Sequence, residues 1–351
     1  MEEKIRLTSF SKGAGCGCKI APSVLQEILQ TKQPTIQYDN LLVGNNTNDD
    51  AAVYDIGGNQ LIISTTDFFM PIVDDAKDFG AIASANAISD VYAMGGRPIM
   101  AIAILGWPIE KLSTSIAQQV LEGAKMICEQ AGIPLAGGHT IDSAEPIFGL
   151  SVTGITQREY LKQNNTSQEG DYIFLTKPIG VGILSTAQKR ESISEAHSVV
   201  MATQMKQLNS VGEKLAKIKG VHAMTDVTGF GLLGHLIEMA SGARLSAELY
   251  YSKIKIIDGA KEYLAQRIIP DATYRNWNSY SAETGFEKGV NVMEAFNLLP
   301  DPQTNGGLLF SVDENSIQEV VELLSLNGYH DFIEPIGRFT EKKDKTIEVK
   351  N

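Results

Sequence analysis

Two cysteines and a lysine lie within four residues near the start of the chain. Cys16 and Cys18 are separated by one glycine, and Lys19 follows directly. A neighbouring ammonium group stabilises a thiolate, so this arrangement predicts a reactive thiol beside a cation. Because three of the five residues from 13 to 17 are glycine, the segment has little apolar area to bury. We therefore predict a flexible catalytic arm over residues 1–19; the alternative is a frayed N-terminus without a function.

Aspartates form a second group of residues that could do chemistry. Two of them follow runs of strand-forming residues, and a third lies on the same face of a predicted helix as Asn86. The group consists of Asp49, Asp50, Asp67, Asp90 and Asp226. Carboxylates that gather at one place repel each other unless cations lie between them, and such oxygen ligands suit Mg²⁺, which usually accompanies phosphates. The alternative is that each aspartate only caps a neighbouring helix or turn.

The sequence offers two candidate nucleotide-binding loops. Residues 13–19 do not form a Walker A motif, because a cysteine precedes Lys19 where that motif requires glycine. Residues 229–234 match the G-x-G-x-x-G pattern, and Glu248 ends a predicted strand near the spacing of a ribose ligand. This match predicts, as one alternative, a nicotinamide-dependent oxidoreductase. Against it, Asp226 stands where the phosphates would approach, and the first half of the chain lacks βαβ units.

The cysteines do not form a zinc-binding pattern. Two thiols one residue apart need two further ligands, and His139 and His235 are far apart in the sequence. Cys128 falls in a predicted amphipathic helix, where we expect a small buried hydrophobic residue. A lone reactive thiolate, aided by Lys19, is the better interpretation of the cysteines.

Composition excludes several classes of protein. The 351 residues are 43% hydrophobic and 21% charged, with a formal net charge of −12, which argues against nucleic-acid and anionic-membrane binding. The first residues lack the apolar region of a signal peptide, and no apolar run is long enough to span a membrane. With three cysteines and no disulfide framework, we expect a cytoplasmic location.

The elements that must position these residues divide the chain in two. Residue 158 begins a polar segment that separates a predicted N-terminal domain, 20–157, from a C-terminal domain, 170–351. In the first domain, helices are predicted over residues 21–31, 79–94 and 113–131, and strands over 41–43, 51–54, 61–66, 99–105 and 147–155, with a glycine-rich turn at 137–140. Hairpin-linked strands with two long helices indicate an α+β layer rather than a doubly wound sheet.

The second half alternates strands and helices. We predict one long helix over residues 195–217, an irregular stretch over 270–300 and a last strand over 333–339. Other strands are predicted over 172–176, 221–225, 245–250 and 308–312, and other helices over 180–189, 230–240, 258–266 and 314–326.

Seven segments, in order along nearly the whole chain, resemble the selenophosphate synthetase (selenide, water dikinase) family. They are residues 13–19 (GAGCGCK), 48–54 (NDDAAVY), 65–69 (TTDFF), 86–96 (NAISDVYAMGG), 136–140 (AGGHT), 225–231 (TDVTGFG) and 301–304 (DPQT). The related aminoimidazole ribonucleotide synthetases share the fold and the aspartates but not the cysteine–lysine arm. Asn305 departs from the serine usual in the family, which concerns a local contact only.

The resemblance implies an α+β, two-domain fold of the aminoimidazole ribonucleotide synthetase type. Its N-terminal sheet domain dimerises, its C-terminal domain is α/β, and ATP binds in the cleft. It also implies a reaction in which ATP, hydrogen selenide and water give selenophosphate, AMP and phosphate, with Mg²⁺ as cofactor and a homodimer as the working unit. Phosphoryl transfer of this kind depends on positioning and charge neutralisation more than on covalent protein chemistry. The second alternative to this enzyme is a protein that carries selenium or a metal on a thiol without catalysis.

The resemblance also assigns roles to residues. It makes Cys16 and Lys19 catalytic, with Lys19 also on the phosphates. It places the Mg²⁺ and ATP-phosphate ligands at Asp50, Asp67, Asp90 and Asp226. Nucleotide contacts fall on Thr47, Asn48 and Asp49, and on Gly138, His139 and Thr140 reaching across from the partner subunit.

Overall fold

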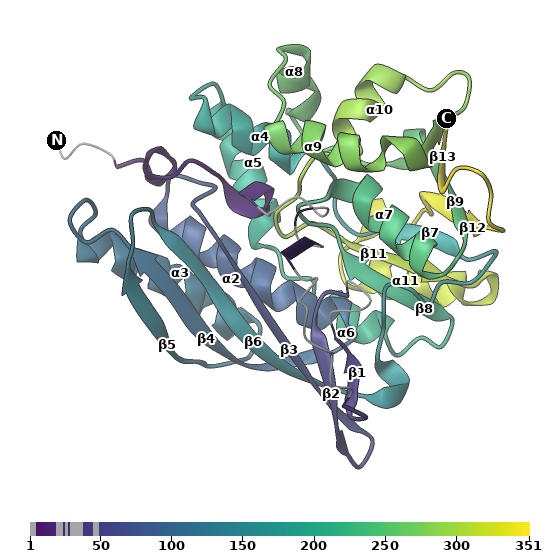
Figure 1. Ribbon diagram of the computed structural model, residues 1–351, viewed down its shortest axis with the longest axis horizontal. Coiled ribbons are helices and arrows are strands. Elements are labelled where there is room, and N and C mark those ends of the chain that lie inside the picture. Colours follow the sequence, from purple (N-terminus) through teal and green to yellow (C-terminus); the bar gives the residue numbers. More distant parts are fainter. Residues whose placement is uncertain (1–4, 19–23, 25–26, 29–37, 45–48) are drawn as a thin grey trace.

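The computed structural model describes residues 5–18, 24, 27–28, 38–44 and 49–351 (Figure 1). Lys19, Thr47 and Asn48 lie outside the described residues, as does most of the helix predicted over residues 21–31. Two sheets dominate the structure, one built from residues 41–157 and the other from residues 172–350. No helix among the described residues is long and apolar enough to cross a membrane.

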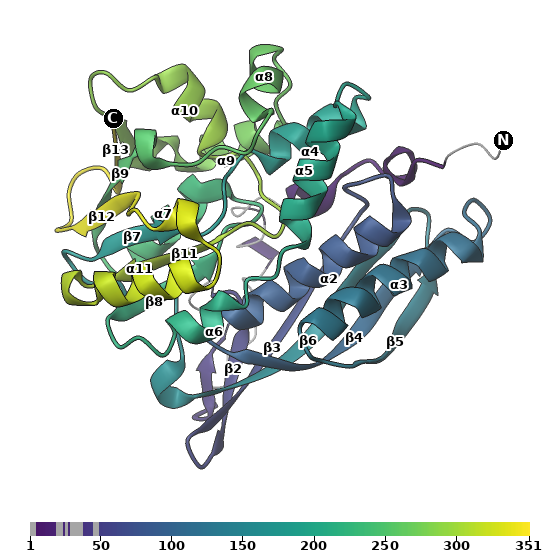
Figure 2. The same ribbon diagram turned by 180° about the vertical axis from the view of Figure 1, so that it is seen from behind.

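The N-terminal sheet has six strands in the order β1-β2-β3-β6-β4-β5. All neighbours are antiparallel except β4 and β5, which are parallel. The strands are β1 (Leu41–Val43), β2 (Ala52–Gly57), β3 (Gln60–Phe69), β4 (Arg97–Trp107), β5 (Leu135–Asp142) and β6 (Ile147–Gln157). Two helices, α2 (Ala76–Ala93) and α3 (Thr114–Gln130), lie side by side along one face of this sheet (Figure 2).

Helix α2 is the central element, because it lies between the two sheets. Nearly all of its residues are buried, and it contacts β3 and β6 on one side and α5, α6 and β8 on the other. A Cβ at Gly80 would lie 1.8 Å from the carbonyl oxygen of Val120, and one at Gly123 would lie 1.9 Å from that of Lys77. Glycine at these two positions therefore lets the backbones of α2 and α3 touch.

The C-terminal sheet has seven strands in the order β10-β13-β9-β12-β7-β11-β8. They are β7 (Tyr172–Leu175), β8 (Val221–Asp226), β9 (Ser246–Tyr250), β10 (Thr284–Phe286), β11 (Leu308–Val312), β12 (Gly337–Thr340) and β13 (Ile347–Lys350). Helix α7 (Gly231–Gly242) lies on the face seen in Figure 1 and α11 (Ile317–Leu326) on the face seen in Figure 2. The other helices are α4 (Val181–Lys189), α5 (Glu195–Lys206), α6 (Val211–Leu215), α8 (Ala260–Ala265), α9 (Asp271–Tyr280) and α10 (Val292–Leu298).

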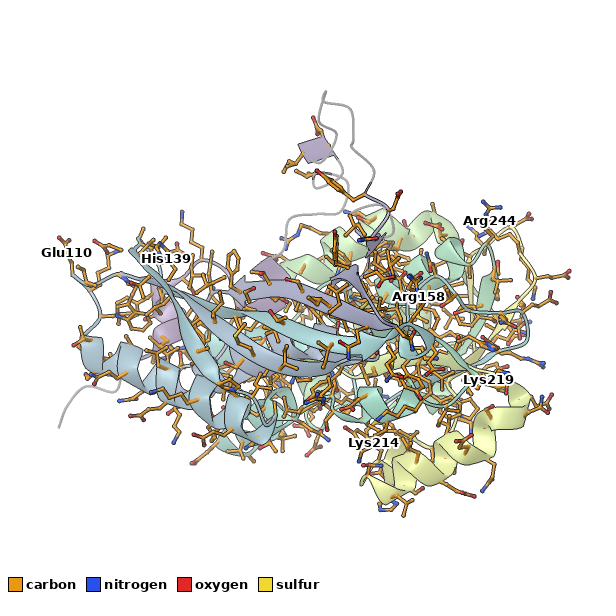
Figure 3. The ribbon with its side chains drawn as sticks, turned by 90° about the horizontal axis from the view of Figure 1, so that it is seen from below. Glu110, His139, Arg158, Lys214, Lys219 and Arg244 are labelled. Atoms are coloured by element: carbon orange, nitrogen blue, oxygen red, sulfur yellow. The ribbon has the colours of Figure 1, made fainter. Side chains whose placement is uncertain are left out.

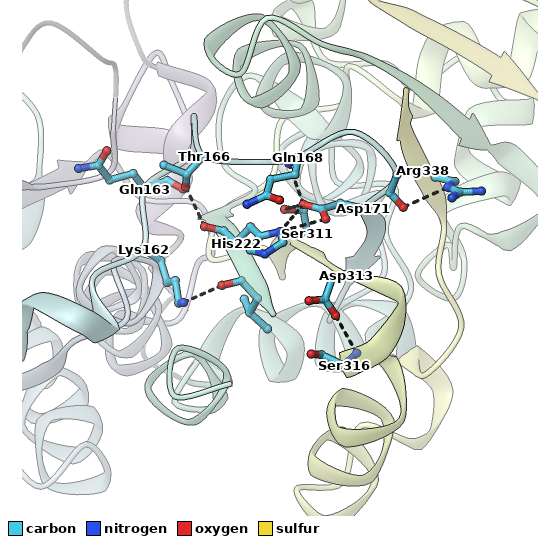
Figure 4. Close-up of polar contacts among 12 residues, drawn as sticks. Lys162, Gln163, Thr166, Gln168, Asp171, His222, Ser311, Asp313, Ser316 and Arg338 are labelled. Carbon is cyan, nitrogen blue, oxygen red and sulfur yellow. Dashed lines mark hydrogen bonds and ion pairs between the residues drawn. The ribbon is translucent and has the colours of Figure 1, made fainter. Parts of the chain in front are cut away.

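The segment between the sheets is held against the C-terminal sheet by polar contacts (Figure 4). The ammonium group of Lys162 donates a hydrogen bond of 2.6 Å to the carbonyl oxygen of Val221. Asp171 accepts hydrogen bonds from the backbone of Gln168 and the hydroxyl of Ser311, and its carboxylate lies 2.9 Å from Nδ1 of His222. The linker is therefore fixed at the start of β8, the strand that leads to Asp226.

Several elements differ from the prediction. Strand β3 runs through Asp67 instead of ending before it, and residues 137–140 belong to the edge strand β5 instead of a turn. The helix predicted over 195–217 is two helices, α5 and α6, separated at residues 207–210. The stretch over 270–300 holds α9, β10 and α10, and the last strand is β13, not the one predicted over 333–339.

Candidate active site

The side-chain amide of Asn86, on α2, joins three distant parts of the chain. Its Oδ1 accepts hydrogen bonds from the thiol of Cys16 (3.3 Å) and from the backbone N–H of Asn305 (2.7 Å). Its Nδ2 donates to Oδ2 of Asp67 on β3, at 2.6 Å. The thiol, one of the predicted phosphate-binding carboxylates and the segment after Asp-Pro-Gln-Thr therefore meet at one side chain.

Cys16 lies in the short 3₁₀ helix Gly15–Cys18 and is only 1% exposed. Its backbone N–H donates to Oγ1 of Thr304 at 3.1 Å, and the N–H of Gly15 donates to the carbonyl oxygen of Met70. The expectation that this segment buries little is therefore wrong for Cys16. Gly15 has φ +50°, and a Cβ there would lie 2.6 Å from the Thr304 hydroxyl, so glycine is required where the segment docks.

A cavity of about 180 Å³ opens beside the thiol. Its lining includes Cys16, Asp67, Phe68 and Phe69, so it is largely apolar with one carboxylate. A small ligand with soft, polarisable atoms would fit this lining, because most of the wall is apolar while the thiol and the carboxylate are its polar features.

Three of the predicted carboxylates lie near one another between the two sheets. Asp50 comes just before β2, Asp90 lies on α2 and Asp226 ends β8. Asp90 and Asp226 are buried, and each accepts a hydroxyl hydrogen bond, from Thr65 and from Ser89 respectively. The predicted placement of Asp226 at the end of a strand is confirmed, as is the helix that carries Asn86 and Asp90 four residues apart.

Asp50 carries the clearest electrostatic signature of the site. Burial raises the pKa of its carboxyl well above the usual value, and the negative charges of Asp226 and Asp90 raise that pKa further. Its Oδ1 accepts a hydrogen bond of 2.9 Å from the hydroxyl of Thr225. Its Oδ2 is buried and has no hydrogen-bond partner among the described residues. A buried, unsatisfied carboxylate oxygen beside two other carboxylates is suited to a cation.

The aspartates of this cluster have the oxygen ligands that Mg²⁺ prefers, although their side chains do not yet converge on one point. Within the described ranges, no group of three or more His, Cys, Asp or Glu side chains is already arranged to hold a metal ion. Asp67 is bound to Asn86, and Asp49 accepts the backbone N–H of Asn164 at 2.8 Å, so Asp49 also anchors the linker. The fold thus brings Asp50, Asp90 and Asp226 near one another, and Oδ2 of Asp50 is the oxygen atom that can still bind a ligand.

Gly138, His139 and Thr140 are not part of this cluster within one chain. They lie on the exposed edge strand β5, and Figure 3 shows His139 near Glu110 at one end of the molecule. Across the sheet Asp67 pairs with Leu150, which pairs with Ala103. Ala103 in turn pairs with Gly138, so three strand spacings, about 14 Å, separate Gly138 from Asp67.

Residues 301–305 support the site from the C-terminal domain. Oδ2 of Asp301 accepts the N–H of Gly182, and Oε1 of Gln303 accepts the N–H groups of Gly180 and Val181 at the start of α4. Burial raises the pKa of the Asp301 carboxyl well above its usual value. Asn305 has φ +48°, a conformation that asparagine tolerates better than most residues. These contacts make the segment a rigid wall behind Cys16.

Sequence reasoning did not assign a role to Asn86, Thr304 or Lys177. Lys177 is fully buried, donates to the carbonyl oxygens of Gln207 and Asn305, and has a pKa lowered to about 7 by burial. Asn86 stands in a segment that resembles the family and shares a helical face with Asp90, which was the available signal. For Lys177 the sequence carries no comparable signal, since a lysine after a strand is normally a surface residue.

Two sequence-based expectations about other motifs have clear outcomes. The dinucleotide interpretation of residues 229–234 is wrong: β8, which leads into them, is an edge strand beside the antiparallel strand β11, and three strands separate it from β9. Glu248 forms ion pairs with Lys343 and Lys350.

Cys128 is buried as expected, and burial raises the pKa of its thiol to about 11, so it is inert.

Comparison with known proteins agrees with this architecture. Residues 48–156 match the N-terminal domain model of AIR synthase related proteins, and residues 168–350 match the C-terminal domain model. Among solved structures, thiamine-monophosphate kinase from Stenotrophomonas maltophilia superposes with a TM-score of 0.64 at 19% identity, covering 89% of this chain and 91% of that one. The hydrogenase maturation protein HypE in complex with ATP superposes with a TM-score of 0.60 at 18% identity, covering 84% and 81%. These likenesses confirm the predicted two-domain fold.

Two relatives are much more similar in sequence. The selenide, water dikinase of Haemophilus influenzae is 51% identical over 349 residues, which is 99% of both chains. That of Yersinia pseudotuberculosis is 54% identical over 347 residues, 98% of both chains. With this identity over nearly the full length, and with a thiol, a carboxylate cluster and two AIR synthase domains in place, the chain belongs to the selenide, water dikinase family of phosphotransferases.

Proposed function

We propose that this enzyme uses ATP, hydrogen selenide and water to form selenophosphate, AMP and orthophosphate, supplying the selenium donor for selenoprotein and seleno-tRNA synthesis. The observation that carries the residue assignment is the Asn86 amide, which hydrogen-bonds both the thiol of Cys16 and the carboxylate of Asp67. A selenium atom held at Cys16 and a phosphate held near Asp67 would therefore be neighbours. Proximity of this kind accounts for much of the rate in phosphoryl transfer.

Cys16 handles selenium in this proposal, and Lys19 steadies the charge that develops on the transferred phosphoryl group. Lys19 follows the 3₁₀ helix Gly15–Cys18 directly in the sequence, three positions after Cys16. An ammonium group there would also favour the thiolate form of Cys16. Cys18 is not assigned chemistry.

Asp50, Asp67, Asp90 and Asp226 would hold Mg²⁺. The buried, unpartnered Oδ2 of Asp50 supports this, because a carboxylate oxygen in that setting gains most from a cation. Bound Mg²⁺ would neutralise the triphosphate. Thr65 and Ser89 fix the orientation of Asp90 and Asp226 by donating their hydroxyl hydrogen bonds.

The nucleotide would contact Thr47, Asn48 and Asp49, and Gly138, His139 and Thr140 from a second copy of the chain. The open face of the N-terminal sheet supports a homodimer, because Phe68, Ile99, Met100 and Ile102 are each at least one third exposed there. A second sheet would bury these side chains. The thiol chemistry is compatible with a reducing cytoplasm, where we place the enzyme.

Phosphorus NMR of the reaction tests the proposal. ATP, Mg²⁺ and the protein are incubated anaerobically with and without selenide, and we expect selenophosphate, AMP and orthophosphate only when selenide is present. The reaction with Cys16→Ser is the control for the assigned thiol. ADP as the nucleotide product, or no selenium-dependent phosphorus signal, would refute the proposal.

A further inference from the structure

A second cavity, of about 280 Å³, borders the N-terminal segment away from the thiol. Gly13, Ala14 and Gly17 line it together with Thr304, but Cys16 does not. The remaining wall comes from α4 and from the start of α9, so the cavity lies between the segment and the C-terminal domain. Figures 1 and 2 both show this N-terminal segment beside α4 and α5.

The charges around this cavity are mostly positive. Four cationic residues line it, Lys12, Lys189, Arg190 and Arg275, against one carboxylate, Asp271. Within the part of the chain that the structure describes, none of the four cations forms an ion pair with a carboxylate. In a chain with a net charge of −12, a cavity that gathers four cations against one carboxylate is a strong local exception.

Two of these cations are bound to the backbone of the N-terminal segment. The ammonium group of Lys189 donates hydrogen bonds to the carbonyl oxygens of Ser11 (3.1 Å), Lys12 (2.6 Å) and Gly13 (3.1 Å). The guanidinium group of Arg275 donates one of 2.9 Å to the carbonyl oxygen of Gly17. The contacts bracket Cys16, so they hold the segment that positions the thiol.

We propose that this cavity binds a phosphate-class oxyanion, which competes with the backbone carbonyls for Lys189 and Arg275 and so loosens the segment that positions Cys16. A neutral carbonyl is a weaker partner for an ammonium or guanidinium group than an oxyanion is. Arg190 forms no hydrogen bond or ion pair with the segment among the described residues, so it can bind the anion without breaking a bond to the arm. The first turn of α9 also borders the cavity, and its positive end favours an anion.

The coupling between anion binding in this cavity and release of the N-terminal segment gives the cavity a role in the catalytic cycle, and that role rests on the proposed function. The reaction releases orthophosphate and AMP, and both carry the required group. Occupation of the cavity by a product would release the arm and open the thiol to the next selenide, whereas an empty cavity would keep the arm docked. Binding itself does not depend on that function and can be measured alone.

Binding is measured by calorimetry with orthophosphate in buffer free of Mg²⁺, where the aspartate cluster repels the anion. The wild type should bind phosphate with saturation, and Arg190→Gln should weaken that binding about tenfold, because one charge-assisted partner is lost. Lys219→Gln is the matched control, since Lys219 is exposed and does not line the cavity. Sulfate should compete with phosphate. Competition by AMP at lower concentration than orthophosphate would identify the nucleotide as the source of the group.

Coupling is measured by the rate at which iodoacetamide alkylates Cys16 in a Cys18→Ser, Cys128→Ser background. Phosphate should accelerate alkylation several-fold in this protein, and that acceleration should be lost at the same phosphate concentration when Arg190→Gln is added. No saturable phosphate binding, or equal binding by the wild type and Arg190→Gln, would overturn the site. Alkylation unchanged by bound phosphate would overturn the coupling. Selenophosphate synthesis is a separate readout, so failure of the proposed function is distinguishable from both.

Discussion

The thiol of Cys16 and the backbone N–H of Asn305 donate to the same oxygen atom, Oδ1 of Asn86. Because Nδ2 of Asn86 is engaged by Asp67, the orientation of the amide is fixed and its oxygen always faces the thiol. Asn86 on α2 therefore holds the N-terminal segment and the 301–305 segment of the C-terminal domain next to each other.

Asn86→Asp should destabilise the protein and raise the pKa of Cys16. The substitution places a carboxylate against Asp67 and removes the donated hydrogen bond, which should cost about 1–3 kcal/mol of unfolding free energy. The new charge should also disfavour the thiolate. Thermal unfolding and thiolate absorbance against pH, in a Cys18→Ser, Cys128→Ser background, measure the two effects. Asn278→Asp makes the same chemical change on the exposed surface of α9; equal behaviour of the two variants would contradict the assignment.

Asp50→Ala and Asp226→Ala should each weaken MgATP binding strongly while the fold is kept. Removing one carboxylate lowers repulsion in the metal-free cluster, so thermal stability should not fall in proportion to affinity. Calorimetric titration with MgATP measures the loss, and Asp344→Ala, at an exposed position, is the control. Wild-type affinity in both active-site variants would exclude these carboxylates as ligands of the metal.

Binding of MgATP should release protons and tighten as pH rises. The pKa of Asp50 is raised, so without a cation this carboxyl keeps its proton to a higher pH than an ordinary aspartate. A cation requires the ionised form, and affinity must therefore increase with pH up to that raised pKa. Calorimetry in two buffers of different ionisation enthalpy measures the protons released. Asp50→Asn should reduce that number; the same proton release in the variant would assign it elsewhere.

The arm substitutions should separate the two thiols. Cys16→Ser and Lys19→Ala should abolish selenophosphate formation, whereas Cys18→Ser should keep substantial activity. Since Cys16 is buried, its replacement should cost a little stability, about 1 kcal/mol, with the serine hydroxyl still able to donate to Asn86. Phosphorus NMR and thermal unfolding on the same samples measure both. An active Cys16→Ser beside an inactive Cys18→Ser would show that the other thiol is catalytic.

A lysine on the open face of the N-terminal sheet should break the proposed homodimer. Ile102→Lys puts a charge at the centre of that face, where the side chain is 43% exposed, and should give a particle near 38.1 kDa in light scattering instead of twice that mass. Val199→Lys, at a 60% exposed position on α5, should leave the mass unchanged. A wild-type monomer with full activity would contradict the dimer.

Local sequence patterns predicted most elements, and they failed where distant contacts decide the structure. The helix over 195–217 contains no proline, and its local break signal, Asn209-Ser210 before α6, is weak. The break after α5 arises from two sets of hydrogen bonds. The backbone carbonyl of Gln207 accepts one from the buried ammonium group of Lys177, and the side-chain amide of Asn209 donates to the hydroxyl of Ser89 and the carbonyl oxygen of Gly306. The sequence places these partners far away along the chain.

The same reason explains the errors around the site. Asp67 suggested the end of a strand, since aspartate is disfavoured inside sheets, but Asn86 satisfies its carboxylate within β3. The glycines at 137 and 138 suggested a turn, yet β5 pairs in parallel with β4. The cluster of Asp50, Asp90 and Asp226 was predicted from the family resemblance; the docking of Cys16 and the role of Asn86 needed the three-dimensional structure.

The contact between Cys16 and Thr304 spans 288 positions of the chain, which sets the order in which the enzyme can mature on the ribosome. The amide of Cys16 has no docking partner of this kind until the 301–305 segment has been synthesised and packed against α2. Loop-closure entropy has to be overcome before a contact over such a distance can form. The thiol can reach Asn86 once α2 has formed, whereas the Thr304 side of its site is completed only with the C-terminal domain. Full burial of Cys16 therefore depends on completion of the C-terminal domain.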